Sequence, residues 1–128
     1  MVKGGKIMSS DGIFKDVKDG LGLDPEDTGF DSELLFSINA AISLIRQQGV
    51  GVDLEVKDDK AKWEYFIPGS SSELLGMVKE FVRLYVKIVF DPPAPSTLKV
   101  MEEVKSELIW RIHVSFEEVE NVTQGIST

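Results

Sequence analysis

Residues 74–90 constrain the fold more than any other part of the chain, because they are apolar on nearly every side of a helix. Twelve of these seventeen positions hold large apolar residues: Leu74, Leu75, Met77, Val78, Phe81, Val82, Leu84, Tyr85, Val86, Ile88, Val89 and Phe90. A helix with so little polar surface is stable only when several neighbours cover it. The segment is therefore predicted to be the central helix of a bundle or to pack on other subunits.

The residues on either side predict where this helix begins and ends. Ser70 and Glu73 have the spacing of a capping box, in which each side chain binds a free backbone N–H of the first turn. Asp91-Pro92-Pro93 ends the helix, because a proline ring disfavours the α conformation in the residue before it.

A second amphipathic helix is predicted from residue 31 to the glycine at position 49. Asp31 is expected to cap its first turn, and Phe30 and Leu35 occupy the positions of a hydrophobic staple. One apolar stripe runs along it: Leu34, Leu35, Ile38, Ala41, Ile42 and Ile45.

Two shorter helices are predicted. The first covers about 11–20, with Ile13, Val17 and Leu21 recurring every four residues, and Gly20 and Gly22 end it. The second follows a cap at Asp58 or Asp59, carries Trp63, Phe66 and Ile67, and closes at Pro68-Gly69. Residues 50–58 between them alternate loosely, and a connection is favoured over a strand because no partner strand is found.

The last helix is predicted to begin at Pro95, which suits a first helical turn. Trp110 lies to one side of its apolar stripe, which consists of Val100, Met101, Val104, Leu108 and Ile112. The fold class is thus all-α: a bundle of four to five helices over residues 11–114. A flexible lead-in (1–10) precedes it, and an extended C-terminal tail (115–128) follows it for docking on a partner.

The formal net charge of −8 makes the chain a poor candidate for gripping nucleic-acid phosphates. Seven of the acids lie within residues 11–31. The chain has no cysteine, which excludes disulfides, thiolate metal sites and thiol catalysis. No apolar run approaches the roughly 20 residues needed to span a bilayer, so no membrane contact is expected.

No arrangement of residues predicts catalysis, a metal site or a cofactor. The single histidine, His113, has no second histidine or cysteine to complete a metal site or a nucleophilic pair. The densest carboxylates are Asp24, Glu26, Asp27 and Asp31, and a calcium loop starting at Asp24 would end on Leu35 instead of a glutamate. The chain is therefore predicted not to be an enzyme.

One basic stripe has two interpretations. Lys79, Arg83 and Lys87 are spaced four apart and share one face of the otherwise apolar helix. They form either its solvent-facing strip or a contact with the acidic segment of a neighbouring subunit, including Asp24, Glu26 and Asp27. A head-to-tail contact of that kind closes into a ring when the rotation permits.

Several motifs, taken in order, resemble the head–tail connector (adaptor) family of tailed bacteriophages over residues 11–114. They are Leu21-Gly22-Leu23, Phe30-Asp31-Ser-Glu-Leu-Leu, Ile38-Asn39-Ala40-Ala41-Ile42, Gln48-Gly49-Val50-Gly51, Tyr85-Val86-Lys87-Ile88-Val89-Phe90-Asp91-Pro92-Pro93 and Glu107-Leu108-Ile109-Trp110-Arg111-Ile112. The resemblance is to prophage-encoded members in particular.

The resemblance implies a structural protein of the virion neck, assembled in the host cytoplasm. It implies a homo-oligomeric ring, usually of twelve copies, between the portal protein and the next neck or tail-completion protein. DNA would pass through the channel without specific binding. By analogy, the portal contacts would be Phe116, Val119, Val122 and Ile126.

Three other functions stay open from the sequence. A tail-completion or tail-terminator protein would more often have a β-rich core. A small metal-dependent enzyme acting on DNA would depend on Asp24, Glu26 and Asp27. A helical regulator that binds a host protein would be a compact monomer with no affinity for a portal.

Overall fold

The computed structural model describes the backbone of residues 12–127 and the side chains of residues 12–116. Its regular structure consists of five helices: α2 (Ile13–Leu21), α3 (Asp31–Gln47), α4 (Trp63–Phe66), α5 (Ser72–Phe90) and α6 (Pro95–Ser127). The only β feature among these residues is one isolated bridge between Gly12 and Lys62. The all-α prediction is confirmed, and residues 50–58 form a connection rather than a strand.

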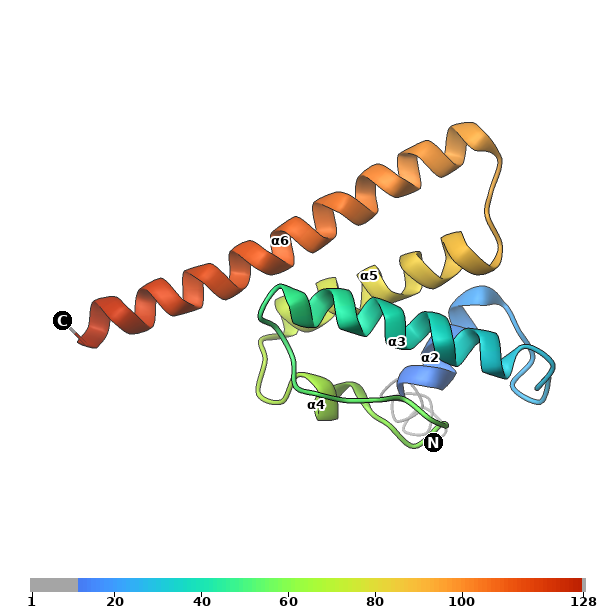
Figure 1. Ribbon diagram of the computed structural model, residues 1–128, viewed down its shortest axis with the longest axis horizontal. Helices are drawn as coiled ribbons and strands as arrows, with labels where there is room; N and C mark the ends of the chain where they lie inside the picture. Colours follow the sequence, from blue (N-terminus) through green and yellow to red (C-terminus); the bar gives the residue numbers. More distant parts are fainter. Residues whose placement is uncertain (1–11, 128) are drawn as a thin grey trace, which may run out of the picture.

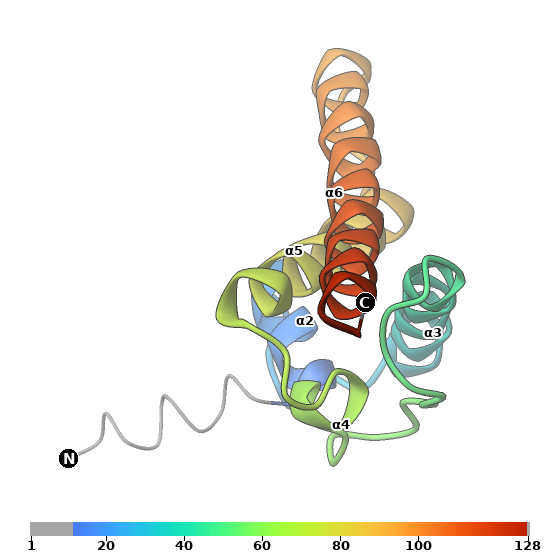
Figure 2. The ribbon, with the colours of Figure 1, turned by 90° about the vertical axis from the view of Figure 1, so that its left-hand side faces the viewer.

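The predicted central position of α5 is confirmed. α5 packs against α3 and α6 and also contacts α2 (Figure 1). Figure 2 looks nearly along the axes of α3 and α5. In this view the two helices lie on either side of the C-terminal half of α6, and α2 and α4 lie below. The innermost residues of α5 are Val78, Phe81, Val82 and Val86. Covering from several directions is what an almost uniformly apolar helix requires.

The hydrophobic core lies between α2, α3, α4 and α5. The stripe predicted for α3 is buried at Leu34, Ile38, Ala41, Ile42 and Ile45, and Leu35 packs against the core from its edge. α2 and α4 contribute Ile13, Phe14, Val17, Trp63 and Phe66. Gly22, in the left-handed conformation with φ 76°, ends α2 as predicted and donates its N–H to the carbonyl of Asp19.

The predicted cap of α3 is wrong. Asp31 is the first helical residue, and Phe30 before it makes no side-chain capping bond. The Asp31 carboxylate instead accepts from the Lys18 ammonium at 3.1 Å. Lys18 is almost fully buried and also donates to the carbonyl of Asp27 at 2.7 Å. The local pattern predicted that the Asp31 carboxylate caps α3, but the carboxylate forms a long-range ion pair with Lys18 instead.

Two other predicted caps also differ. α5 is capped by Ser71, whose hydroxyl accepts from the N–H of Leu74 at 3.1 Å, and not by Ser70. α4 begins after Lys62 without a side-chain cap. Asp58 makes a local turn instead, accepting from the N–H of Lys60 at 2.9 Å. Ser71 and Asp58 thus accept hydrogen bonds from nearby backbone N–H groups, but not in the capping positions that the sequence predicted.

Asn39 explains how residues 50–58 stay extended without a partner strand. Its amide group donates to the carbonyl of Val56 at 2.9 Å, and its amide oxygen accepts from the N–H of Val56 at 2.8 Å. One side chain of α3 therefore satisfies both backbone groups of a buried residue, as a neighbouring strand would.

α6 is a single helix from Pro95 to Ser127, and its C-terminal end extends beyond the other helices (Figure 1). The predicted 115–128 tail is thus helical as far as Ser127. The predicted stripe is partly wrong, because Val100 and Val104 are exposed. α6 packs on the core through Leu108, Ile109, Ile112 and Phe116. Among the described residues, no helix is both long and apolar enough to cross a membrane.

Candidate assembly surfaces

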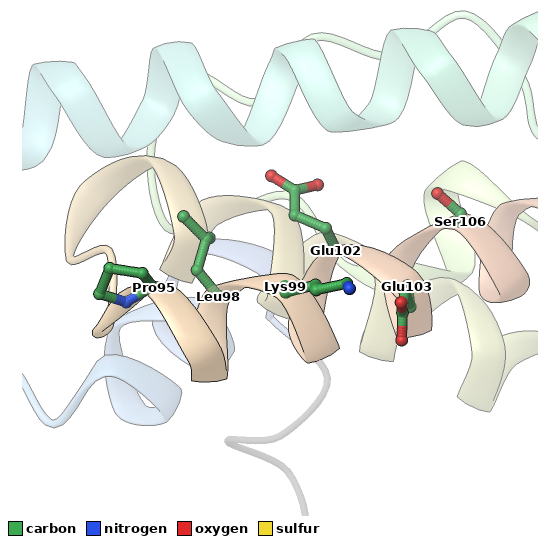
Figure 3. Close-up of a pocket in the computed structure, with 6 residues that line it drawn as sticks. All are labelled: Pro95, Leu98, Lys99, Glu102, Glu103 and Ser106. Atoms are coloured by element: carbon green, nitrogen blue, oxygen red, sulfur yellow. The ribbon is translucent and has the colours of Figure 1, made fainter.

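The described surface has several open hollows. One is lined entirely by α6, at Pro95, Leu98, Lys99, Glu102, Glu103 and Ser106, so its walls come from one helix (Figure 3). Within the part of the chain that the structure describes, no three His, Asp or Glu side chains lie close enough to hold a metal ion. The exposed charged and apolar side chains of this surface bear on contacts with other proteins.

Arg83, the middle residue of the basic stripe, is bound inside the chain. Its guanidinium donates to both carboxylate oxygens of Asp16 at 2.8 Å, and Asp16 also accepts from the Trp63 indole N–H at 2.9 Å. Asp16 is buried, while the Arg83 side chain keeps 36% of its surface exposed. This contact joins α2, α4 and α5, so it stabilises the bundle.

The other predicted inter-subunit residues lie on the surface. Lys87 pairs at 3.1 Å with Asp91, the residue that follows the end of α5, and Lys79 is half-buried. Asp24 and Asp27 are exposed and accept from the N–H groups of Glu26 and Gly29 respectively. The acidic loop is thus shaped by its own carboxylates, and the contact between two subunits stays a prediction.

Of the four predicted portal-contact residues, only Phe116 has a described side chain, and it packs inside the chain. Val119, Val122 and Ile126 lie outside the residues whose side chains are described. The Phe116 ring lies over Gly49, where an added Cβ would come within 2.8 Å of it. Gly49 has φ +89° and ends α3, so glycine both permits the turn and makes room for the ring.

Most of the exposed large apolar side chains of the described residues lie in one groove or on α6. The aromatic groove lies between the start of α3 and the end of α5 and is lined by Phe30, Ser32, Glu33, Phe36, Ser37, Val89, Phe90 and Asp91. On α6, Val100 and Val104 are exposed one turn apart, and Trp110 is exposed on another side, where it lines a hollow with Glu73 and Met77 of α5. Phe36 is 79% exposed and Trp110 63% exposed, although residues of this size usually bury much of their surface.

Sequence reasoning missed the aromatic groove, although one signal was available. Phe36 falls outside the apolar stripe of the second predicted helix, and a large aromatic residue on the polar face of a helix indicates a contact surface. The structural roles of Lys18 and Asn39 were also missed. Their partners lie 13 and 17 residues away in the sequence, so no local pattern contains them.

A scan of protein-family models finds a match to a family described as "Phage connector protein" over residues 13–119. No curated protein and no solved structure matches the chain. The matched range begins with α2 and runs through the whole bundle into the C-terminal part of α6. The family is structural, and its place is the neck of the phage particle. The chain therefore belongs to the phage connector protein family and has a structural role in the phage neck.

Proposed function

We propose that this chain forms a ring of twelve copies in the neck, between the portal protein and the next neck or tail-completion protein. The ring surrounds the channel through which DNA passes, and it assembles in the host cytoplasm. Family membership supports a position at the head–tail junction. The shape of the molecule supports contacts with other proteins of the neck, because the end of one long helix extends beyond the other helices (Figure 1).

The extended end of α6 is the observation on which the proposal rests. Residues 117–127 continue the helix beyond Phe116, the last described side chain that packs on the bundle. In the sequence, Val119, Val122 and Ile126 follow one another at intervals of three and four residues. That interval suits a helix with one apolar face. We assign this end of α6 to the portal and place the contact beyond Phe116.

The charge of the chain suits a channel that does not hold DNA. With a net charge of −8, a ring of identical copies repels the phosphates of a passing duplex. Because such a ring does not hold the duplex, DNA can slide through it during packaging and ejection.

The contact between Lys79, Arg83 and Lys87 of one copy and Asp24, Glu26 and Asp27 of the next remains part of the proposal. Arg83 and Lys87 already have partners within the chain, at Asp16 and Asp91. Such a contact would therefore set the register between copies more than it would add affinity.

Mass measurement in solution tests the ring. The chain, a cognate portal and their mixture are each measured by native mass spectrometry or light scattering. We expect the chain alone to be a monomer or weakly associated, and the mixture to hold one ring of chains per portal. A chain that stays monomeric with portal present would contradict the proposal.

A further inference from the structure

The turn Gly49-Val50-Gly51, which follows α3, lies between two aromatic rings from different helices. The Phe116 ring of α6 covers Gly49, where an added Cβ would come within 2.8 Å of it. The Phe66 ring of α4 covers Gly51, where an added Cβ would come closer still. Both glycines have positive φ, +89° and +91°. Glycine at these two positions therefore permits the turn and lets each ring approach the backbone closely.

The turn is fixed on the bundle from several sides, so it is a firm support for the ring above it. The N–H of Gly49 donates to the carbonyl of Arg46 at 2.9 Å, which ties the turn to the end of α3. The N–H of Val52 donates to the carbonyl of Phe66 at 2.9 Å, which ties it to α4. Val50 is buried between these two bonds. A change at this contact is therefore taken up by the ring and by α6 rather than by the turn.

Phe116 is the last described side chain through which α6 packs on the bundle. Leu108, Ile109 and Ile112 hold the turns before it. The helix continues to Ser127, which adds roughly 16 Å at 1.5 Å per residue. The contact of the Phe116 ring with the turn thus lies at the base of the end of α6 that extends beyond the other helices (Figure 1).

The spacing of these contacts amplifies any movement of the ring. Measured along the helix from Ile112, Phe116 lies about 6 Å away and the end of α6 about 22 Å away. An added Cβ on Gly49 would have to displace the ring by about 1 Å to restore ordinary contact between carbons. When α6 turns about the fully buried Ile112, that displacement moves its end by about 4 Å.

We infer that the Gly49-Val50-Gly51 turn sets the direction in which α6 leaves the bundle. Phe116 is then a positioning residue for docking on the portal, which acts through α6 and does not touch the portal. The inference rests on the proposed function, since it explains how the portal-docking end is aimed. An end that is already aimed loses less freedom on binding than an end that swings.

The distance between two spin labels on the free chain tests the inference. The labels are attached at Ser43→Cys, an exposed position of α3, and at Gln124→Cys near the end of α6, and the chain has no other cysteine. The parent chain should give one narrow distance distribution. Gly49→Ala should shift or broaden it by about 4 Å. Gly22→Ala is the matched control and should change nothing, since Gly22 also has positive φ but nothing lies within 4 Å of its Cβ position.

A second variant removes the ring without straining the turn, so it tests the inference even where Gly49→Ala does not fold. Phe116→Ala should broaden the distance distribution, because the end of α6 loses its last contact. Leu108→Ala is its control, since Leu108 is also a partly buried residue of α6 that packs on the core. Ile109 packs at the same level of the helix, so Leu108→Ala should lower stability and keep the parent distribution.

Binding to portal connects the direction of α6 with docking. Apparent affinity falls in proportion to the fraction of molecules that have the competent arrangement. A Phe116→Ala chain with about one molecule in ten at the parent distance should therefore bind portal about tenfold more weakly. Leu108→Ala should bind portal as the parent chain does.

The outcomes separate this inference from the proposed function. The Phe116 ring also lines an open hollow with Ile67 and Leu74, so it has room to swing aside while α6 stays in place. Folded Gly49→Ala and Phe116→Ala chains that keep the parent distribution would overturn the inference. A broadened distribution with unchanged portal affinity would overturn the positioning role of Phe116. A parent chain that does not bind portal overturns the proposed function, while the distances in the free chain still decide what sets the direction of α6.

Discussion

The chain has two tryptophans, and one is buried in the helical bundle whereas the other is exposed on the last helix. Trp63 is 2% exposed, in the bundle formed by α2 to α5, and its indole N–H is bound by Asp16. Trp110 is 63% exposed on α6, and Ile112 is the only fully buried apolar residue among the described side chains of that helix. Apart from the aromatic groove, the bundle buries most of its apolar side chains and binds its buried polar groups, whereas α6 is fixed at its middle and leaves Val100, Val104 and Trp110 exposed.

The contrast indicates where stability and where assembly are located. Substitutions at buried positions of the bundle should lower the free energy of unfolding, because they remove buried contacts or a buried hydrogen bond. Substitutions on the outer side of α6 should leave stability unchanged and act on association. The following predictions test that separation, from the largest expected effect on stability to the smallest.

Replacing the two tryptophans should give the largest difference. Trp63→Ala removes a fully buried side chain and deprives Asp16 of a donor, so we expect a loss of about 3–5 kcal/mol. A loss of that size would unfold much of a domain of ordinary stability. Trp110→Ala should change stability by less than about 0.5 kcal/mol. Urea unfolding followed by circular dichroism measures both, and similar losses would contradict the division into two regions.

Asp16→Ala should have the next largest effect, about 2–3 kcal/mol, because it leaves the buried Trp63 N–H without an acceptor. Arg83 is partly exposed and can be solvated, so its loss of a partner adds little. Asp19→Ala, on the same helix, breaks only the exposed pair with Lys15 and should be nearly neutral. Thermal unfolding of the two variants side by side makes the comparison, and equal midpoints would refute the structural role of Asp16.

Gly49→Ala tests the junction between the two regions. A side chain at φ +89° costs about 1–2 kcal/mol, and its Cβ would also displace the Phe116 ring. Gly76→Ala is the control, because Gly76 lies within α5 with open space around it and alanine favours a helix. Chemical unfolding should show a loss for the first variant and a gain of about 0.5–1 kcal/mol for the second. A neutral Gly49→Ala would mean that the ring does not lie on this glycine.

Ending the chain after Glu117 should have the smallest effect on stability. The cut keeps Ile112 and Phe116, which hold α6 on the bundle, and removes Val119, Val122 and Ile126. We expect an unchanged unfolding midpoint and loss of binding to portal, measured by co-sedimentation. A truncated chain that still binds portal would assign the docking surface to another part of the molecule.

The sequence predicts the helices well because their signals are local. Four of the helices are predicted closely from the period of their apolar residues and from residues that end helices, such as Gly22, Gly49 and Pro92-Pro93. Prediction from the sequence fails where a residue far away in the chain determines which contact a side chain makes. Asp31 pairs with Lys18 and does not cap its helix. Val100 and Val104 belong to the same predicted stripe as Leu108 and Ile112, but only the later residues of that stripe pack on the core. The period of an apolar stripe does not reveal how much of its length the rest of the molecule covers.

For the assembly surfaces too, the sequence predicts some features and misses others. The family resemblance predicts a neck protein, and the family match confirms it. The groove at Phe36 and the internal partner of Arg83 depend on how α2, α3 and α5 pack, so they become visible only in three dimensions.

Hydrogen exchange of the backbone amides, with and without portal, tests the central contrast most directly. In the free chain, amides around Val78–Val86 should exchange far more slowly than those around Val100–Val104. On portal, exchange in the α6 segment around Val119–Ile126 should slow, while the buried segment Val78–Val86 stays unchanged. Equal protection of Val100–Val104 and Val78–Val86 in the free chain, or no change of α6 on portal, would contradict the account.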